Sequence, residues 1–289
     1  MDNSITLKDG RQLGYALYGP PSGPAVIYLH GFPSCRLEFG LMAKGDVRVI
    51  SPDRPGYGLS TPAPDHTFAR FADDLRALAD ALGLGRFALM GLSGGAPYAA
   101  CAAGLLKERV GALALISGLG PPEAPGMDKG RPALLRHFGR NPIQRRLAFE
   151  AIRAGLLKTA ADVYYPRLRK LFTFAEGASR DGEIMTPKFC ADLIACWREA
   201  LRQSIEGPAL DARLYDLPWP IDPHTLQLPT LVWHGDADPV VPPQIAEYYA
   251  RTLPHAEYRS FPGDGHVSLI ARHHGEILNW LVQDAHALN

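Results

Sequence analysis

The sequence has no excess of charge of either sign, since 30 Lys and Arg residues balance 30 Asp and Glu residues in a chain of 289 residues. A domain dedicated to nucleic acid carries a basic excess, and a disordered acidic chain carries the opposite excess. The balance argues against both classes of protein, and we expect no nucleic-acid partner.

The sequence also lacks a long hydrophobic run and a clustered cysteine pattern. No apolar stretch approaches the roughly 18 residues that a transmembrane helix needs, and the first residues lack the basic patch and apolar stretch of a secretory signal. None of the four cysteines has the short paired spacing of a metal site or of a small disulfide framework. We therefore expect reduced thiols, no membrane span and a cytoplasmic protein.

Short apolar runs alternate with helical patterns over the first 118 residues, which is typical of βαβ units and of a largely parallel sheet. The chain opens with a predicted hairpin whose strands, 4–8 and 12–18, flank an Asp9-Gly10 turn. Further apolar runs predict buried strands, and apolar positions three or four residues apart predict helices. These strands cover residues 25–30, 47–51, 86–92 and 110–117, and the helices cover residues 68–82 and 94–106.

The pattern changes between residues 119 and 228, where no strand of similar quality is present. Segments rich in Gly and Pro bound this stretch, and its interior predicts amphipathic helices, for example over 143–159 and 187–205. The earlier alternation then returns, with strands predicted at 230–234 and 257–261 and helices at 243–253 and 267–284.

The sequence thus predicts an α/β fold in which helices flank a mostly parallel sheet. Its core is discontinuous and consists of residues 1–118 and 229–289, with residues 119–228 inserted as a helical cap or lid. The chain is longer than a typical domain of about 100–200 residues. A single core with an insertion accounts for that length.

Ser93 stands between glycines in the segment Gly91-Leu92-Ser93-Gly94-Gly95, a Gly-x-Ser-x-Gly motif. The motif falls between a predicted strand and a predicted helix, which is the context that it needs. A sharp strand-to-helix turn leaves room only for glycine at Gly91 and Gly95. It also projects the serine hydroxyl above the sheet edge, at the positive end of the helix. These residues predict a serine nucleophile.

A serine hydroxyl is a weak nucleophile, so it needs a general base, and the base needs an orienting acid. The chain order serine, acid, histidine is expected when the serine lies on such a turn. Asp236 and Asp238 follow the strand predicted at 230–234, and His266 follows the strand predicted at 257–261. Both loops lie at the carboxyl ends of strands, where open α/β sheets assemble their sites.

With these motifs in the expected order, the chain resembles the α/β-hydrolase family over most of its length outside the predicted cap. The family places its acid in a Gly-x-x-Asp pattern, which implies Asp238 here and leaves Asp236 as a turn-forming or loop-ordering residue. The family's base matches His266. Some members take the acid from after the strand that precedes the cap, and Glu123 is the nearest candidate. Residues 53–60 resemble a further family segment, whose role is loop architecture behind the site.

Acyl transfer also needs hydrogen-bond donors for a tetrahedral oxyanion. The residue after the nucleophile, Gly94, supplies one backbone N–H. The segment His30-Gly31-Phe32-Pro33 resembles the family's His-Gly-x-Pro and implies the N–H of Phe32 as the second donor. Pro33 has no N–H and cannot serve. We expect His30 to brace this loop without contacting substrate.

The predicted cap carries its charge unevenly. Between residues 129 and 170, eleven Lys and Arg residues accompany two acids, whereas residues 171–222 hold five basic and nine acidic residues. A basic lining would attract an anionic substrate, but a solvated helical face explains the same pattern. Aromatic residues of the cap either line an acyl pocket or form the cap's own core. They are Tyr164, Tyr165, Phe172, Phe174 and Trp197.

The resemblance implies a serine hydrolase that cleaves a carboxylic ester of a small or medium-sized molecule through an acyl-enzyme on Ser93, without a metal or organic cofactor. A serine rather than an aspartate at this position argues against epoxide hydrolases and haloalkane dehalogenases. A proline-iminopeptidase-like aminopeptidase stays open through cap acids such as Glu150 or Glu199. A carbon–carbon bond hydrolase stays open through the basic half of the cap. A perhydrolase, a homodimer and a ligand-binding member of the fold without turnover stay open as well.

Overall fold

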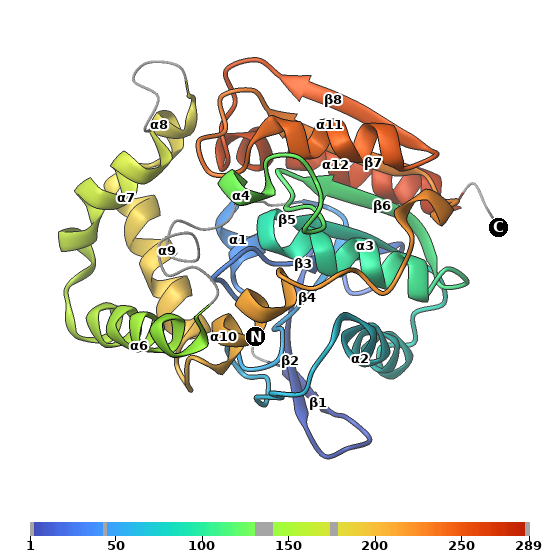
Figure 1. Cartoon of the computed structure of the whole chain (residues 1–289). Helices are drawn as coiled ribbons and strands as arrows, with labels where there is room; N and C mark the ends of the chain where they lie inside the picture. Colours follow the sequence, from blue (N-terminus) through green and yellow to red (C-terminus); the bar gives the residue numbers. More distant parts are fainter. Residues whose placement is uncertain (1–2, 43–44, 131–140, 174–178, 287–289) are drawn as a thin grey trace.

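The polypeptide folds around one sheet, in a computed structural model that describes residues 3–42, 45–130, 141–173 and 179–286. The strands of the sheet are β1 (Asn3–Thr6), β2 (Gln12–Tyr18), β3 (Ala25–Leu29), β4 (Arg48–Pro52), β5 (Phe87–Leu92), β6 (Val110–Ile116), β7 (Thr230–Gly235) and β8 (Ala256–Phe261). Their order is β1-β2-β4-β3-β5-β6-β7-β8 (Figure 1). β1 and β2 form the predicted hairpin, β2 also pairs antiparallel with β4, and all later pairs are parallel. The predicted α/β class is confirmed.

The central strands are buried over their whole length because helices cover both faces of the sheet. β3, β5 and β6 contain only buried residues. Successive side chains of a strand point to opposite faces, so Ile27 and Leu89 join one hydrophobic cluster while Val26 and Ala88 join the other. The first cluster includes residues of α2 (Phe68–Ala81), α3 (Ala96–Leu105) and α11 (Pro243–Thr252), and the second includes residues of α1 (Glu38–Met42) and α12 (Ser268–His286).

Helix α2 illustrates how local sequence specifies these elements. Its residues Phe68, Phe71 and Leu75 are spaced three or four positions apart, so all three lie on the buried face. Thr67 caps the N-terminus, where its hydroxyl accepts a hydrogen bond from the N–H of Arg70 at 3.1 Å. The spacing and the cap together define the helix.

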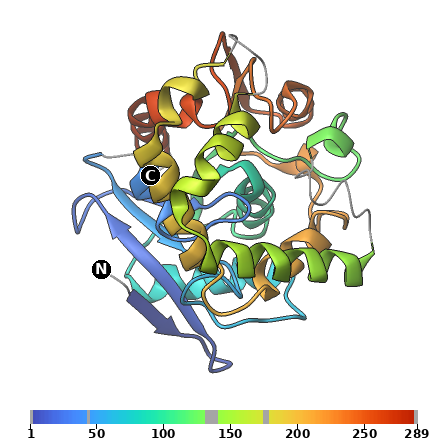
Figure 2. The ribbon, with the colours of Figure 1, turned by 90° about the vertical axis from the view of Figure 1, so that its left-hand side faces the viewer.

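Between β6 and β7, the described residues form helices and helical turns and no strand, as the sequence predicted. The helices are α4 (Met127–Gly130), α6 (Pro142–Lys158), α7 (Tyr165–Phe172), α8 (Asp181–Ile184), α9 (Pro187–Ala200) and α10 (Glu206–Leu214). Helices α6, α7, α8 and α9 lie beside the core, on the left of Figure 1, and α6, α7 and α9 lie in front of it in Figure 2. α9 contacts α1, and α8 contacts α12. The insertion therefore packs at the carboxyl edge of the sheet, where the loops follow the strands.

One helix boundary differs from the prediction by more than two residues. The helix predicted over residues 187–205 ends at Ala200, whose carbonyl accepts a hydrogen bond from the N–H of Gly58 at 3.1 Å. The chain then turns, and α10 begins at Glu206, which the sequence pattern did not indicate. A contact with a distant core loop therefore takes the place of a further helical turn.

The cysteines Cys35, Cys101, Cys190 and Cys196 are all buried and free. Cys35 of the core and Cys196 of α9 lie against each other, with their Sγ atoms 3.5 Å apart. Within the described residues, no helix combines the length and the apolar character needed to cross a membrane.

Candidate active site

The chain turns sharply at Ser93, where β5 ends and a helical turn leads into α3. The backbone φ of Ser93 is 52°, in the left-handed region that non-glycine residues seldom adopt. A Cβ atom on Gly91 would lie 2.7 Å from the Cα of Ala96, and one on Gly95 would lie 2.1 Å from the carbonyl oxygen of Leu29. The surrounding backbone therefore requires both glycines.

His266 and Asp238 are brought together by the loops that follow the neighbouring strands β8 and β7. Nδ1 of His266 lies 2.8 Å from Oδ2 of Asp238. The other carboxylate oxygen of Asp238 accepts hydrogen bonds from the N–H groups of Val240 and Val241, at 2.8 and 2.9 Å. With the proton on Nδ1 directed at the carboxylate, Nε2 of the imidazole presents the lone pair that a general base needs.

The other two acidic candidates occupy different places. Asp236 orders the loop, because its Oδ1 accepts a hydrogen bond from the N–H of Gly263 at 2.7 Å. Glu123 is exposed, whereas Asp238 is buried against the imidazole. The geometry therefore favours Asp238 as the partner of His266.

The electrostatics of this pair suit proton transfer. Burial would raise the pKa of Asp238, but His266 and His234 outweigh it and hold that pKa below its ordinary value. Burial would likewise lower the pKa of His266, but Asp238, Asp181 and Glu38 outweigh it and raise that pKa above its ordinary value. Nearby carboxylates thus stabilise the imidazolium that forms when the ring takes a proton.

Ser93 and His266 line one small cavity of about 50 Å³ at the carboxyl edge of the sheet. Gly31 and Phe32, from the loop after β3, line the same cavity. The structure thus brings the predicted nucleophile, the predicted base and the predicted oxyanion loop together. The remaining described walls are Pro33, Glu38, Met42, Leu92, Phe172, Leu193, Trp197 and Val267.

Two of the aromatic residues considered for an acyl pocket, Phe172 and Trp197, reach this cavity from the insertion. The ring of Phe172 stacks near His266, with 6.3 Å between the ring centroids. Tyr164 and Tyr165 instead pack against a hydrophobic cluster of the core and the insertion. Phe174, also considered from the sequence, lies outside the described residues.

The two segments expected to bind an oxyanion lie against each other. A Cβ atom on Gly94 would lie 3.3 Å from the backbone nitrogen of Phe32. Behind them His30 is buried, and its Nε2 accepts a hydrogen bond from the N–H of Arg54 at 3.2 Å, while its Nδ1 lies 3.0 Å from the carbonyl oxygen of Gly31. Burial and the charge of Arg54 lower the pKa of His30, so the ring is neutral and braces the loop.

Glu38 is a cavity residue that sequence reasoning missed. Its Oε2 accepts hydrogen bonds from the N–H of Gly31 at 2.7 Å and from the hydroxyl of Tyr28 at 2.6 Å. Burial raises the pKa of its carboxyl. The short helix α1 that carries Glu38 has no long periodic pattern, so the sequence offers no local signal for this role.

Asp181 is a second residue that sequence reasoning missed, and it comes from α8 of the insertion. Its carboxylate accepts hydrogen bonds from three successive backbone N–H groups, those of His266, Val267 and Ser268, at 2.9, 3.0 and 2.7 Å. These N–H groups lie at the N-terminus of α12, where an anion is favoured by the unpaired amides and by the helix dipole. A carboxylate of the insertion thus holds the loop that carries His266.

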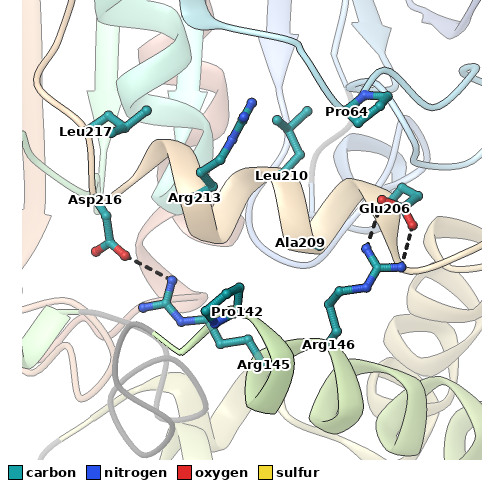
Figure 3. Close-up of a pocket in the computed structure, with 10 residues that line it drawn as sticks. All are labelled: Pro64, Pro142, Arg145, Arg146, Glu206, Ala209, Leu210, Arg213, Asp216 and Leu217. Atoms are coloured by element: carbon teal, nitrogen blue, oxygen red, sulfur yellow. Dashed lines mark hydrogen bonds and ion pairs between the residues drawn. The ribbon is translucent and has the colours of Figure 1, made fainter.

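Two basic residues of the insertion, Arg145 and Arg146, pair with acids away from this cavity. Arg145 donates to Asp216 at 2.9 Å, and Arg146 donates to both oxygens of Glu206 at 3.1 and 2.7 Å (Figure 3). These pairs border a larger hollow of about 340 Å³ between α6 and α10, apart from the candidate nucleophile. The described lining of the cavity at the nucleophile contains no Lys or Arg. The described basic residues therefore do not form an anion-attracting lining there.

Among the residues that the structure describes, no group of three or more His, Cys, Asp or Glu side chains is arranged to bind a metal ion.

Residues 24–272 match the family model described as alpha/beta hydrolase fold, and the chain belongs to that family. It is 29% identical over 270 residues to a non-heme chloroperoxidase, CPO-A1, from Kitasatospora aureofaciens, with 90% of each chain covered. It is 25% identical over 274 residues to the bifunctional esterase/perhydrolase DCH from Acinetobacter calcoaceticus, covering 91% of this chain and 92% of that one. Its fold matches the solved structure of a thermophilic esterase from Thermogutta terrifontis, with a TM-score of 0.68, 25% identity and coverage of 98% and 97%.

We predict that Gly95→Ala lowers the free energy of unfolding by about 1–3 kcal/mol, as overpacking typically does. The new Cβ would lie 2.1 Å from the carbonyl oxygen of Leu29 and 2.8 Å from that of His30, and backbone atoms cannot rotate away. Urea denaturation measures the change. Gly85→Ala is the control, because a Cβ there meets nothing within 4 Å. Equal midpoints for Gly95→Ala and Gly85→Ala would contradict the steric account.

We predict that Asp181→Asn moves the acidic limb of the pH profile of kcat/KM to lower pH. Asp181 is one of the carboxylates that raise the pKa of His266, so removing its charge lowers that pKa and the free base persists in more acidic solution. Ser268→Ala is the control, because it removes a hydrogen bond to the N–H of Gly265 in the same loop without changing any charge. A limb that stays in place in Asp181→Asn, or moves equally in Ser268→Ala, would refute the electrostatic role.

Proposed function

We propose that this protein is a serine hydrolase that cleaves carboxylic esters, with Ser93 as nucleophile, His266 as general base and Asp238 as orienting acid. The observation that carries the proposal is the 2.8 Å contact between His266 and Asp238 beside the cavity that His266 shares with Ser93. The relative named as an esterase/perhydrolase and the esterase of similar fold support the same chemistry.

In the proposed reaction, Oγ of Ser93 attacks the ester carbonyl carbon while Nε2 of His266 takes the hydroxyl proton. The N–H groups of Phe32 and Gly94 stabilise the oxyanion of the tetrahedral intermediate. His266 then returns the proton to the departing alcohol, leaving an acyl-enzyme. Water attacks this ester as His266 accepts its proton, and the acid departs as the serine is restored. Asp238 stays ionised throughout and stabilises the imidazolium.

We infer that residues 119–228 act as a cap and that the acyl group of the substrate is short. The cavity of about 50 Å³ is far smaller than the roughly 300 Å³ or more of pockets for drug-sized ligands. Phe172, Leu193 and Trp197 of the insertion enclose it. A long acyl chain would have to displace these side chains.

Two alternatives, an aminopeptidase and a carbon–carbon bond hydrolase, have less support from the described side chains. Glu199, considered as the holder of a free amine, is paired with Arg36 at 2.7 Å and with Arg202 at 3.2 Å, and Glu150 is exposed. The described lining also offers no cation for the anionic substrates that carbon–carbon bond hydrolases prefer. Ester hydrolysis therefore has the stronger support.

Perhydrolysis is a second candidate activity, because relatives over nine-tenths of the chain are named as non-heme chloroperoxidase and as esterase/perhydrolase. In this reaction hydrogen peroxide replaces water in attack on the acyl-enzyme, and the product is a peracid. Both activities require the same nucleophile and base.

We predict that Ser93→Ala lowers kcat for p-nitrophenyl acetate by at least about 10⁴-fold and abolishes labelling by a fluorophosphonate probe, because the attacking hydroxyl is absent. The wild-type protein should cleave the acetate and butyrate faster than the octanoate, as the small cavity requires. Ser117→Ala is the control, since Ser117 is also a buried serine at the end of a strand, β6. Ser117→Ala should keep wild-type turnover. Turnover that survives in Ser93→Ala would overturn the assignment of the nucleophile.

We predict that hydrogen peroxide added with a short-chain ester yields a peracid, detected by iodide oxidation, and that Ser93→Ala forms none. The physical reason is that peroxide is a stronger nucleophile than water toward the same acyl-enzyme. Free acid as the sole product at saturating peroxide would exclude this second activity and leave ester hydrolysis standing.

A further inference from the structure

Helix α10 of the insertion carries a buried carboxylate, Asp211, that gathers hydrogen-bond donors from the core. Its Oδ2 accepts from Nη2 of Arg54 at 2.6 Å and from the hydroxyl of Tyr57 at 2.9 Å, and its Oδ1 accepts from the hydroxyl of Tyr98 at 2.5 Å. Arg54 and Asp211 are both 0% exposed. Removing such a pair from water is costly, and apolar residues of similar volume could fill the same space equally well. Stability alone therefore does not account for this ion pair.

The same guanidinium also holds the loop that follows β3. Its Nη2 donates to the carbonyl oxygen of Gly31 at 2.9 Å, and its Nη1 donates to the carbonyl oxygen of His30. The neutral ring of His30 adds a second donor, because its Nδ1 lies 3.0 Å from the same Gly31 oxygen. The carbonyl of Gly31 therefore receives two donors, one of them charged.

That carbonyl belongs to the peptide group whose N–H is contributed by Phe32. A donor at the oxygen of a peptide polarises the whole group, so its N–H becomes a stronger donor in turn. Because the peptide is planar, holding the oxygen also fixes the direction of the N–H. The second proposed donor, the N–H of Gly94, shares its peptide group with the carbonyl of Ser93. That carbonyl accepts a hydrogen bond from the N–H of Leu119 at 3.0 Å, an uncharged and therefore weaker donor than Arg54.

We propose that Arg54 and Asp211 are positioning residues for the oxyanion. Arg54 places a positive charge behind the Phe32 N–H, and Asp211 holds the guanidinium in the orientation that reaches Gly31. The inference rests on the proposed ester hydrolysis and deepens it, because it makes α10 of the insertion part of the catalytic apparatus. Tyr215 belongs to the same network, since its hydroxyl lies 3.3 Å from Oδ2 of Asp211 and donates to the carbonyl oxygen of Gly94 at 2.9 Å.

The first test is Asp211→Asn in the full chain, assayed with p-nitrophenyl acetate and normalised to active sites by fluorophosphonate titration. We expect kcat to fall about tenfold to hundredfold with KM within about twofold, since complete loss of one oxyanion donor costs roughly 10²–10³ in kcat. The affinity for an arylboronic acid, which forms a tetrahedral adduct with serine, should fall in parallel with kcat/KM. A purely structural role would lower the active fraction and leave both quantities per active site unchanged.

A second variant guards against failure to fold, because Asp211→Asn leaves the Arg54 charge buried without its partner. The double variant Arg54→Met with Asp211→Asn buries no unpaired charge, yet it lacks the donor behind Phe32. The matched control is Arg145→Met with Asp216→Asn. It removes another largely buried ion pair of the insertion, at the hollow of Figure 3, away from the catalytic peptides. We expect the control to keep wild-type kcat and boronate affinity.

The outcomes separate this inference from the proposed function. An active wild-type protein whose Arg54/Asp211 variants keep wild-type kcat and boronate affinity would overturn the inference alone. A wild-type protein with no ester turnover would overturn the proposed function. In that case the amide proton of Phe32, observed by NMR with ¹⁵N-phenylalanine labelling, decides the inference. We expect it to move upfield in the double variant as polarisation is lost, and an unmoved resonance would refute the idea.

Discussion

The close approach of the backbone at Gly95 is the constraint on which the site depends. Because Gly95 has no Cβ, the start of α3 can lie against the carbonyl oxygens of Leu29 and His30, at the end of β3. This contact places the left-handed turn at Ser93 beside the loop that follows β3. The same approach brings Gly94 against the backbone of Phe32. A larger residue at Gly95 would separate the candidate nucleophile from the loop that carries the N–H of Phe32.

The insertion and the core are joined by buried charges as well as by apolar packing. Asp181 accepts hydrogen bonds from three N–H groups at the start of α12, and Asp211 accepts hydrogen bonds from the guanidinium of Arg54 behind the loop that follows β3. A buried carboxylate is tolerated only when donors surround it, so each contact specifies one position of the insertion on the core. Movement of the insertion would therefore disturb both halves of the proposed catalytic machinery together.

Much of the fold and part of the site could be predicted because their signals are local. The turn at Ser93 needs glycines within two residues, the central strands are continuous apolar runs, and the loops with Asp238 and His266 directly follow strands. The proximity of these loops follows from the parallel sheet. The choice of Asp238 over Asp236 came from resemblance, and the hydrogen bonds of the two side chains favour the same choice. Their catalytic roles remain proposals.

The sequence by itself determined the order of the strands and of the longer core helices, the sharp turn at Ser93 and the helical nature of the insertion, because periodicity and steric exclusion act over a few residues. Only the tertiary structure decided which carboxylates surround the site, how small the cavity is and where the described basic residues of the insertion lie. Arg54 and Asp211 stand 157 positions apart, and nothing near either residue identifies its partner. Such pairs depend on how α10 docks on the core, which is a property of the whole packed chain.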